Sequence, residues 1–155
     1  MAIITEGMIL KAIAFIKPTA QTMLRTQGLT WGPKYVEGNI RINGLPASKF
    51  RFGTMVKWNP KWGEIKNFAK IAQRKRAEAE RGRTNTSAIV AARPWILRKG
   101  DYLYSGGAYR DGIAVGVSGA FGWVDEAIAI MLIDVIVMLA HLEVDGRITA
   151  KQMQL

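Results

Sequence analysis

The sequence predicts an α+β domain in which a central antiparallel sheet of about five strands is flanked by helices. Three observations support this fold class. A length of 155 residues suits a single domain, and a hydrophobic content of 49% is enough for a buried core. Runs of strand-forming residues are separated by asparagine–glycine and aspartate–glycine turns. Apolar residues recur at helical spacing before, between and after these runs.

The first half is predicted to hold a helix followed by a hairpin. Apolar residues at helical spacing span Thr5–Gln27, and Pro18 predicts either one bent helix or two short ones. The strand-like runs Lys34–Ile42 and Phe50–Trp58 follow, separated by the turn residues Asn43–Gly44. We therefore expect a hairpin with an irregular loop.

The next segment, Glu64–Arg81, is predicted to be an amphipathic helix because its apolar residues recur at helical spacing. Its second half interleaves both signs of charge. Arg74 with Glu78, and Arg76 with Glu80, are pairs four residues apart that lie on one face of a helix. Runs of this kind are typical of exposed faces, so we interpret it as a solvated surface.

Three further strands are predicted, at Ser87–Leu97, Tyr102–Tyr109 and Ile113–Ser118. Asp111–Gly112 lies between the last two and suits a type I′ turn. Glycines on the last strand and its exit leave little side-chain bulk, which lets another group approach the backbone closely. These glycines are Gly116, Gly119 and Gly122.

The glycine series also invites a phosphate-loop interpretation, since glycine-rich backbone can hold an anion at a helix start. The spacing fits neither a P-loop nor a dinucleotide motif, so turns and close packing are the favoured roles. An anionic group resting on the backbone amides of Ser118–Gly122 stays open as an alternative.

A final helix is predicted to open at Trp123, with Asp125 and Glu126 where a helix N-terminus favours negative charge. Its apolar part, Ala127–Ala140, is shorter than the ~20 residues that cross a bilayer. A buried or oligomer-facing helix is therefore expected, and a membrane span is not. Asp134 inside it should be buried at a subunit contact, paired with an arginine or tyrosine across the boundary. Residues 142–155 form a short C-terminal extension with a turn at Asp145–Gly146.

Composition excludes several kinds of site. Without cysteine, the chain has no disulfide, thiolate zinc site, iron–sulfur cluster or cysteine nucleophile. With one histidine, His141, it has no two-histidine metal site, and we expect no metal centre. His141 near the end of the last helix is favoured there by the helix dipole, and it is also a candidate haem ligand. Met1–Ala14 lacks the basic start of a signal peptide, so a cytoplasmic protein is expected.

A net charge of +10 attracts nucleic acid, anionic lipid, acidic proteins or anionic small molecules. Phe50, Phe52, Trp58 and Trp62 alternate with lysine and arginine, as in single-stranded nucleic-acid sites. Half of the side chains of a strand face the core, however, so buried Phe50 and Phe52 with a basic outer face are favoured. We therefore expect no nucleic-acid partner.

The second half of the chain resembles the GlcG/HbpS-like family, which includes the C-terminal domain of PduO-type proteins. The similarity rests on the helix and strand start at Phe68–Ile89, on Gly106–Gly107, and on the segment DGIAVGVSGAFGWVDEAIA, Asp111–Ala129. It implies a central antiparallel sheet flanked by helices, assembly into a higher oligomer, and a haem-binding or accessory role. Haem ligation would fall to His141, to a methionine such as Met55, or to a tyrosine, because the first half has no histidine.

The resulting hypothesis is an oligomeric accessory protein, a single domain over residues 1–155, that binds haem or another small anionic or aromatic ligand. The alternatives are a small subunit of a larger catabolic enzyme, or a cofactor-free enzyme acting on a small organic acid. In the enzyme, Arg110 or Arg93 would bind the carboxylate, and Asp125 or Glu126 would move a proton. The expected pocket lies at Gly119–Glu126. Its predicted ligand-binding residues are Gly107, Tyr109, Ser118, Gly119, Phe121 and Trp123.

Overall fold

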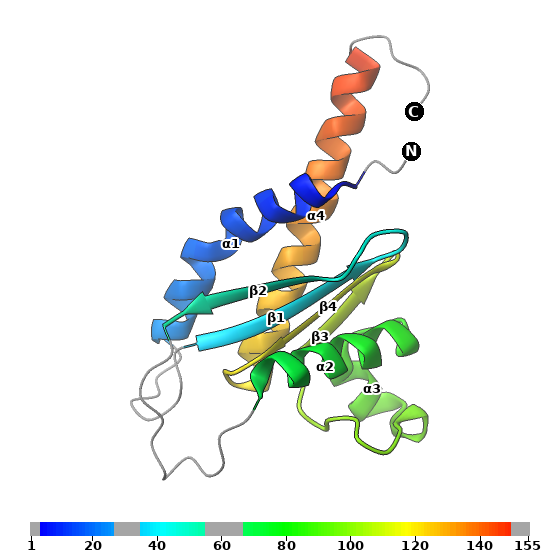
Figure 1. Ribbon diagram of the computed structural model, residues 1–155. Helices are drawn as coiled ribbons and strands as arrows, with labels where there is room; N and C mark the ends of the chain where they lie inside the picture. The colour runs from blue at the N-terminus through cyan, green and yellow to red at the C-terminus, as the bar shows by residue number, and fades with distance from the viewer. Residues whose placement is uncertain (1–3, 27–34, 55–66, 150–155) are drawn as a thin grey trace.

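A computed structural model describes residues 4–26, 35–54 and 67–149 of the chain. These residues form helices and strands in the order α1, β1, β2, α2, α3, β3, β4, α4, with a short 3-10 helix between α3 and β3 (Figure 1). Their bounds are α1 Glu6–Thr26, β1 Tyr35–Ile42, β2 Ser48–Gly53, α2 Phe68–Gly82, α3 Thr86–Ala92, η2 Pro94–Ile96, β3 Gly107–Arg110, β4 Ile113–Ser118 and α4 Gly122–Thr149.

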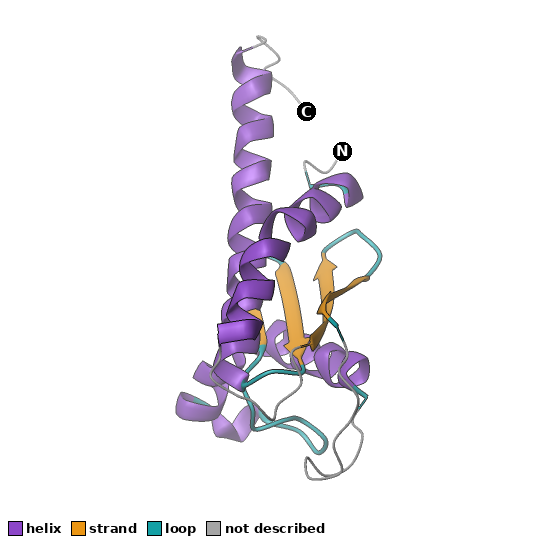
Figure 2. Cartoon of the chain, turned by 90° about the vertical axis from the view of Figure 1, so that its left-hand side faces the viewer, coloured by secondary structure: helices purple, strands orange, loops and turns teal. Residues whose placement is uncertain are grey.

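The strands form one antiparallel sheet with the order β2-β1-β4-β3. Its two hairpins are joined through the central pair β1–β4, in which Asn39 lies opposite Gly116. At the β3–β4 turn, Asp111 and Gly112 have φ angles of 50° and 86°, as a type I′ turn requires. Helices cover both faces of the sheet, α1 and α4 on one side and α2 with α3 on the other (Figures 1 and 2). The expected α+β single domain with an antiparallel sheet is confirmed.

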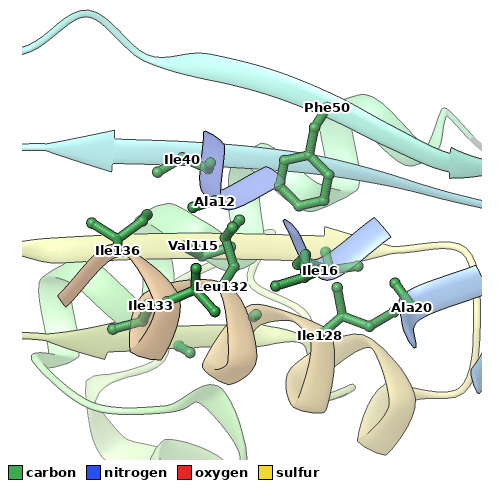
Figure 3. Close-up of a cluster of buried hydrophobic side chains, with 14 of the residues drawn as sticks. Ala12, Ile16, Ala20, Ile40, Phe50, Val115, Ile128, Leu132, Ile133 and Ile136 are labelled. Atoms are coloured by element: carbon green, nitrogen blue, oxygen red, sulfur yellow. The ribbon is translucent and has the colours of Figure 1, made fainter. Parts of the chain in front are cut away.

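The sheet face toward α1 and α4 is apolar. Alternate residues of the strands point into this layer, including Ile40, Phe50 and Val115 (Figure 3). They meet Ile16 of α1 and Leu132 of α4, both 2% exposed or less. The prediction that Phe50 and Phe52 belong to the core is therefore correct.

The opposite face is covered by α2, which lies very close to the sheet. A Cβ added at Gly116 of β4 would lie 2.0 Å from the carbonyl oxygen of Ala72, and one at Gly107 of β3 would lie 2.4 Å from that of Lys75. Each distance is well inside van der Waals contact. The close approach expected at the glycine-rich strand is therefore real at Gly116, and the approaching group is the backbone of α2.

Two predicted strands differ from the structure. Residues of the expected strand Ser87–Leu97 form α3 and η2, because Asn85, Thr86 and Ser87 start a helix and Pro94 starts a 3-10 turn. Within the expected strand Tyr102–Tyr109, pairing begins only at Gly107. The described residues therefore contain four strands, not five.

The interpretation of the α2 charge run as a solvated surface is wrong. Lys75, Arg76 and Glu78 are 3%, 6% and 1% exposed. Lys75 and Arg76 share a helix face with Ala72 and Ala79 that packs on the sheet, and Glu78 meets the loop before β3 at the backbone N–H of Tyr102. The expected pair Arg76–Glu80 forms. Arg74 instead donates to the carbonyl oxygen of Gly100.

In the first half, α1 is one helix with Pro18 inside it, and β1 and β2 form the expected hairpin. Several predictions lie outside the described residues. They concern the parts of the expected elements that fall in 27–34 and 55–66, and the side chains of Met55, Trp58 and Trp62.

Helix α4 continues to Thr149, so Asp145–Gly146 lies inside a helix and does not form the expected turn. Its N-terminal half is buried in the core, as Ile128, Leu132 and Ile136 show. Its C-terminal end extends past α1 and the sheet (Figures 1 and 2). The segment Gly122–Ile148 is long and apolar enough to cross a membrane by length and composition, a test that core helices also pass, and 33% of its most apolar stretch is buried.

Candidate functional site

The predicted site lies where β4 ends and α4 begins. Ser118 is the last residue of β4 and is 5% exposed. Gly119 follows with a φ of 135°, and a Cβ there would lie 2.3 Å from the carbonyl oxygen of Tyr35. Tyr35 therefore occupies the space beside Gly119, as Lys75 occupies the space beside Gly107. The glycines of the predicted pocket pack against this chain's own backbone.

Asp125, in the first turn of α4, is buried in an ion pair. Its Oδ2 lies 3.2 Å from Lys75 Nζ, and the two side chains are 1% and 4% exposed. Its Oδ1 accepts a hydrogen bond of 3.0 Å from the backbone N–H of Ala120. Burial raises the pKa of Asp125 to about 6, against the lowering effect of Lys75 and of these hydrogen bonds. Asp125 thus holds the turn between β4 and α4 and links it to α2.

Glu126 serves a different contact. Its Oε2 accepts hydrogen bonds from the backbone N–H of Ser87 at 3.1 Å and from Thr86 Oγ1 at 3.3 Å, and its Oε1 accepts one from Ser87 Oγ at 2.5 Å. Thr86 Oγ1 also accepts from the backbone N–H groups of Gly106 and Gly107, each at 3.0 Å. Glu126 therefore fastens the start of α3 to α4 and to the beginning of β3.

The two carboxylates do not converge on one point. Adjacent helix residues point about 100° apart, and here Asp125 meets α2 while Glu126 meets α3. The two carboxylates therefore have separate contacts at the start of α4. Both oxygens of each carboxylate have partners inside the protein, and these contacts join elements of the fold.

The aromatic residues of the predicted pocket fall into two groups. The rings of Phe121 and Trp123 are stacked with centroids 4.5 Å apart and an interplanar angle of 20°. Trp123 is 69% exposed, so one large aromatic surface faces solvent at the start of α4. Tyr109 alternates with Ala108, which belongs to the α1–α4 core, and so points to the face covered by α2 and α3.

Arg110 and Arg93, the candidate carboxylate binders, are engaged within the chain. Arg110 Nη1 donates to Asp134 Oδ1 at 2.6 Å, and the two side chains are 44% and 55% exposed. Arg93 Nη2 donates to the carbonyl oxygen of Gly82 at 2.9 Å. In the single chain Asp134 is half exposed, because α4 turns that side away from the core, and its arginine partner comes from β3 of the same chain. Its burial at a subunit contact stays a prediction.

His141 lies far from the other predicted residues. It is exposed, on the part of α4 that extends from the body. Eighteen residues of helix separate it from Trp123, a rise of about 27 Å. A shallow hollow of about 460 Å³, lined by Lys11, Ala14, Phe15 and Leu139, lies where α1 meets α4. None of the predicted ligand-binding residues lines it.

Sequence reasoning missed the residues that hold this region together, namely Lys75, Glu78, Thr86 and Ser87. Glu78 is buried, with its Oε2 accepting from the backbone N–H of Tyr102 at 3.2 Å and its Oε1 without a hydrogen-bond partner. Burial raises the pKa of Glu78 to about 7. The small residues Ala72 and Ala79, at helical spacing with Lys75 and Arg76, are the signal that this side of α2 faces the protein.

Comparison with known proteins found similarity in structure only. No protein-family model matches the sequence, and no curated protein matches it. The crystal structure of a PduOC–haem complex superposes with a TM-score of 0.51 at 18% sequence identity, covering 82% of this chain and 91% of that one. The structure of Klebsiella pneumoniae protein ORFY, of the DUF336 family, gives a TM-score of 0.46 at 16% identity, covering 81% and 89%. The first likeness shows a shared fold, which agrees with the fold implied by the resemblance to the GlcG/HbpS-like family.

Proposed function

We propose, from the fold that this chain shares with the haem-complexed PduOC domain, that it is an oligomeric accessory protein that binds a small planar ligand, with haem as the first candidate. The observation that carries the proposal is the stacked pair Phe121–Trp123. An exposed tryptophan held by a neighbouring ring offers a flat, rigid surface at little entropic cost, which suits an aromatic or macrocyclic ligand.

The charge of the chain favours an anionic ligand. The net charge is +10, and haem carries two propionate groups that a basic surface attracts. Direct anion binding by the loop amides is less favoured, because the Ala120 N–H is already bonded to Asp125. The aromatic surface, with long-range attraction from the basic chain, is therefore the proposed basis of binding.

Ligation of haem iron by histidine does not fit at this pair. The lone histidine lies about 27 Å along α4 from Trp123, and Tyr109 points to the other face of the sheet. Met55 lies outside the described residues. We therefore propose that a porphyrin stacks on Trp123 without a histidine ligand to its iron. A metal-free porphyrin should then bind with the same affinity as haem.

The buried carboxylates favour a binding role over acid–base catalysis. Asp125 and Glu126 are 1% and 8% exposed, and their oxygens are engaged with α2, α3 and the β4–α4 turn. A general acid or base must come within hydrogen-bond distance of the substrate proton. Ligand binding is therefore the better-supported function of this region.

The test is a titration with haem and with metal-free protoporphyrin, followed by the porphyrin absorbance band and by tryptophan fluorescence. Trp123→Ala should weaken both affinities about tenfold, because an aromatic anchor is lost. Trp95→Ala, which removes another tryptophan that is 75% exposed, is the matched control and should leave both unchanged. Equal affinities for the wild type and Trp123→Ala would remove this pair from the site. A histidine-type haem spectrum that disappears in His141→Ala would place the site elsewhere.

A further inference from the structure

Helix α4 exposes an apolar stripe on the side that faces away from the core. Ile130, Met138, Leu142 and Ile148 are 37%, 40%, 59% and 56% exposed. At about 100° per residue they lie, with two polar residues, within about a third of the helix circumference. We call this surface the α4 stripe and define it as Ile130, Asp134, Met138, His141, Leu142 and Ile148.

The far end of the stripe has little support from its own chain. From His141 onward α4 extends beyond α1 and the sheet, and most of its residues are exposed or half-buried (Figures 1 and 2). Leucine and isoleucine exposed together on a protruding helix favour association, and an isolated helix end is marginal in water without packing. A partner surface that covers this end would stabilise it.

The two polar residues at the middle of the stripe indicate which partner. Asp134 and His141 are seven residues apart, which is about 10 Å along the helix on nearly the same side. A two-fold axis that crosses the helix midway between them, beside Val137 and Met138, reverses the direction of the second helix. Such an axis brings each Asp134 next to His141 of the other copy, and it does so twice.

We propose that a second copy of this chain packs antiparallel on the α4 stripe about a two-fold axis at Val137–Met138, with Asp134 of each copy paired to His141 of the other. The proposal rests on the oligomer of the proposed function and specifies its contact surface. Arg110 from β3 already pairs with Asp134 and holds its carboxylate at this position. The exposed apolar residues on both sides of the Asp134–His141 pairs would then be covered by the α4 stripe of the second copy.

A lipid bilayer is the competing occupant, and the charges at the centre of the stripe argue against it. Inserting α4 into hydrocarbon would expose Asp134 to lipid near the middle of the apolar segment, which is costly. It would also remove Ile128, Leu132 and Ile136 from the core, where they are fully buried. Pairing with a second copy leaves the core intact.

The absence of cysteine makes a direct crosslinking test available. In Met138→Cys, the two cysteines would lie beside the two-fold axis and should form a disulfide-linked dimer on mild oxidation. Leu103→Cys is the control, because Leu103 is 69% exposed in the loop before β3 and outside the stripe. Crosslinking of Met138→Cys no faster than of Leu103→Cys would overturn the proposed axis.

Charge exchange tests the pairing, with dissociation constants measured by sedimentation of the full-length protein. Asp134→Lys and His141→Asp should each weaken association about tenfold, since the first removes the carboxylate that pairs with His141 and the second places two carboxylates together. The double variant should recover to within about threefold of the wild type. Arg110→Ala controls for loss of the intrachain pair and should change association less than about threefold. A double variant as weak as the singles would overturn the pairing.

The Leu142→Glu variant distinguishes a wrong contact surface from the absence of any oligomer. It should weaken association about 100-fold, and Leu103→Glu should have no effect. If the Leu142→Glu protein keeps the oligomer mass of the wild type, the α4 stripe is not the contact surface, although the protein is still an oligomer. A monomeric wild type would overturn both. A monomer that co-sediments with phosphatidylcholine vesicles would show that a membrane, and not a second copy, covers the stripe. Porphyrin binding tests the proposed function independently.

Discussion

The two faces of the sheet are packed by opposite means. On the α1–α4 face, large aliphatic and aromatic side chains such as Leu132 and Phe52 interdigitate. On the α2 face, glycines bring two backbones together, the charged side chains Lys75 and Arg76 lie in the contact, and Glu78 is buried beside it against the loop before β3. One face excludes water by side-chain volume, and the other by close approach of main chains.

The difference shows how a charged helix face can be buried. Because α2 lies so near β4, water has little room between them, and each buried charge needs a partner within the protein. Asp125 pairs with Lys75, Arg76 Nε donates to Asn39 Oδ1 at 2.7 Å, and Glu78 receives the Tyr102 N–H. The α2 face should therefore tolerate substitution less than the apolar face does.

The largest expected effect comes from a substitution that prevents the close approach of α2 to β4. In Gly116→Val the new Cβ would lie 2.0 Å from the Ala72 carbonyl oxygen and 2.5 Å from the Arg76 amide nitrogen, so α2 would have to move. We expect a loss of more than about 4 kcal/mol in the free energy of unfolding, or no folded protein. Urea unfolding measures this. Gly146→Ala is the control, because among the described residues no atom outside the neighbouring helix backbone lies within 4 Å of the new Cβ, and alanine favours a helix by up to about 1 kcal/mol.

The second effect tests whether charges on the α2 face are needed as pairs. Lys75→Met should cost about 3–5 kcal/mol, because Asp125 would stay buried without its cation. Adding Asp125→Asn should restore at least half of the loss, since the asparagine oxygen can still accept from the Ala120 N–H. If the double variant were as unstable as the single one, unpaired charge would not be the cause.

The third effect is a pH dependence that the apolar face cannot produce. The pKa of Glu78, about 7 in the folded chain, lies above its ordinary 4.5, so the folded state binds more protons between these pH values. The free energy of unfolding should therefore fall as pH rises through this window. Asp125, with a pKa of about 6 against 3.8, acts in the same direction.

Glu78→Gln should flatten this dependence and gain about 2 kcal/mol relative to the wild type between about pH 5 and pH 8. Thermal unfolding of both proteins across this range is the measurement. Parallel curves for the two proteins would mean that Glu78 does not titrate in the window.

The smallest effect concerns an exposed pair at the edge of the apolar face. Arg110 and Asp134 are about half exposed, so Arg110→Ala should cost less than about 1 kcal/mol, and less still in about 0.5 M salt. Urea unfolding at low and high salt measures this difference. A loss comparable with that of Lys75→Met would show that exposure does not distinguish the two ion pairs.

Much of the fold could be predicted because apolar periodicity and turn residues act locally. Helices α2 and α4 and the turn at Asp111–Gly112 follow from such signals. The prediction fails at Ser87–Leu97, where β-branched residues favour a strand but the capping residues at the start of the segment favour the helix that forms.

The predicted site was only partly recoverable from the sequence. The separate roles of Asp125 and Glu126 follow from helix geometry, but their partners are 50 and 39 residues away in the chain. A run of mixed charge does not show which face of a helix packs, so Lys75 and Glu78 could not be found from charge pattern alone. The exposure of Asp134 depends on how α4 turns against the core, and local pattern does not fix that rotation.

The central position of the β1–β4 pair has a consequence for the order of folding. The two strands at the middle of the sheet come from opposite halves of the chain, with Glu37 opposite Ser118. Two-state proteins dominated by such distant contacts fold more slowly, because loop closure precedes the contacts that repay it. During synthesis, the β1–β2 hairpin would present Val36, Ile40 and Phe52 to solvent until β4 and α4 emerge. A nascent chain arrested before Ser118 would therefore be a target for chaperones.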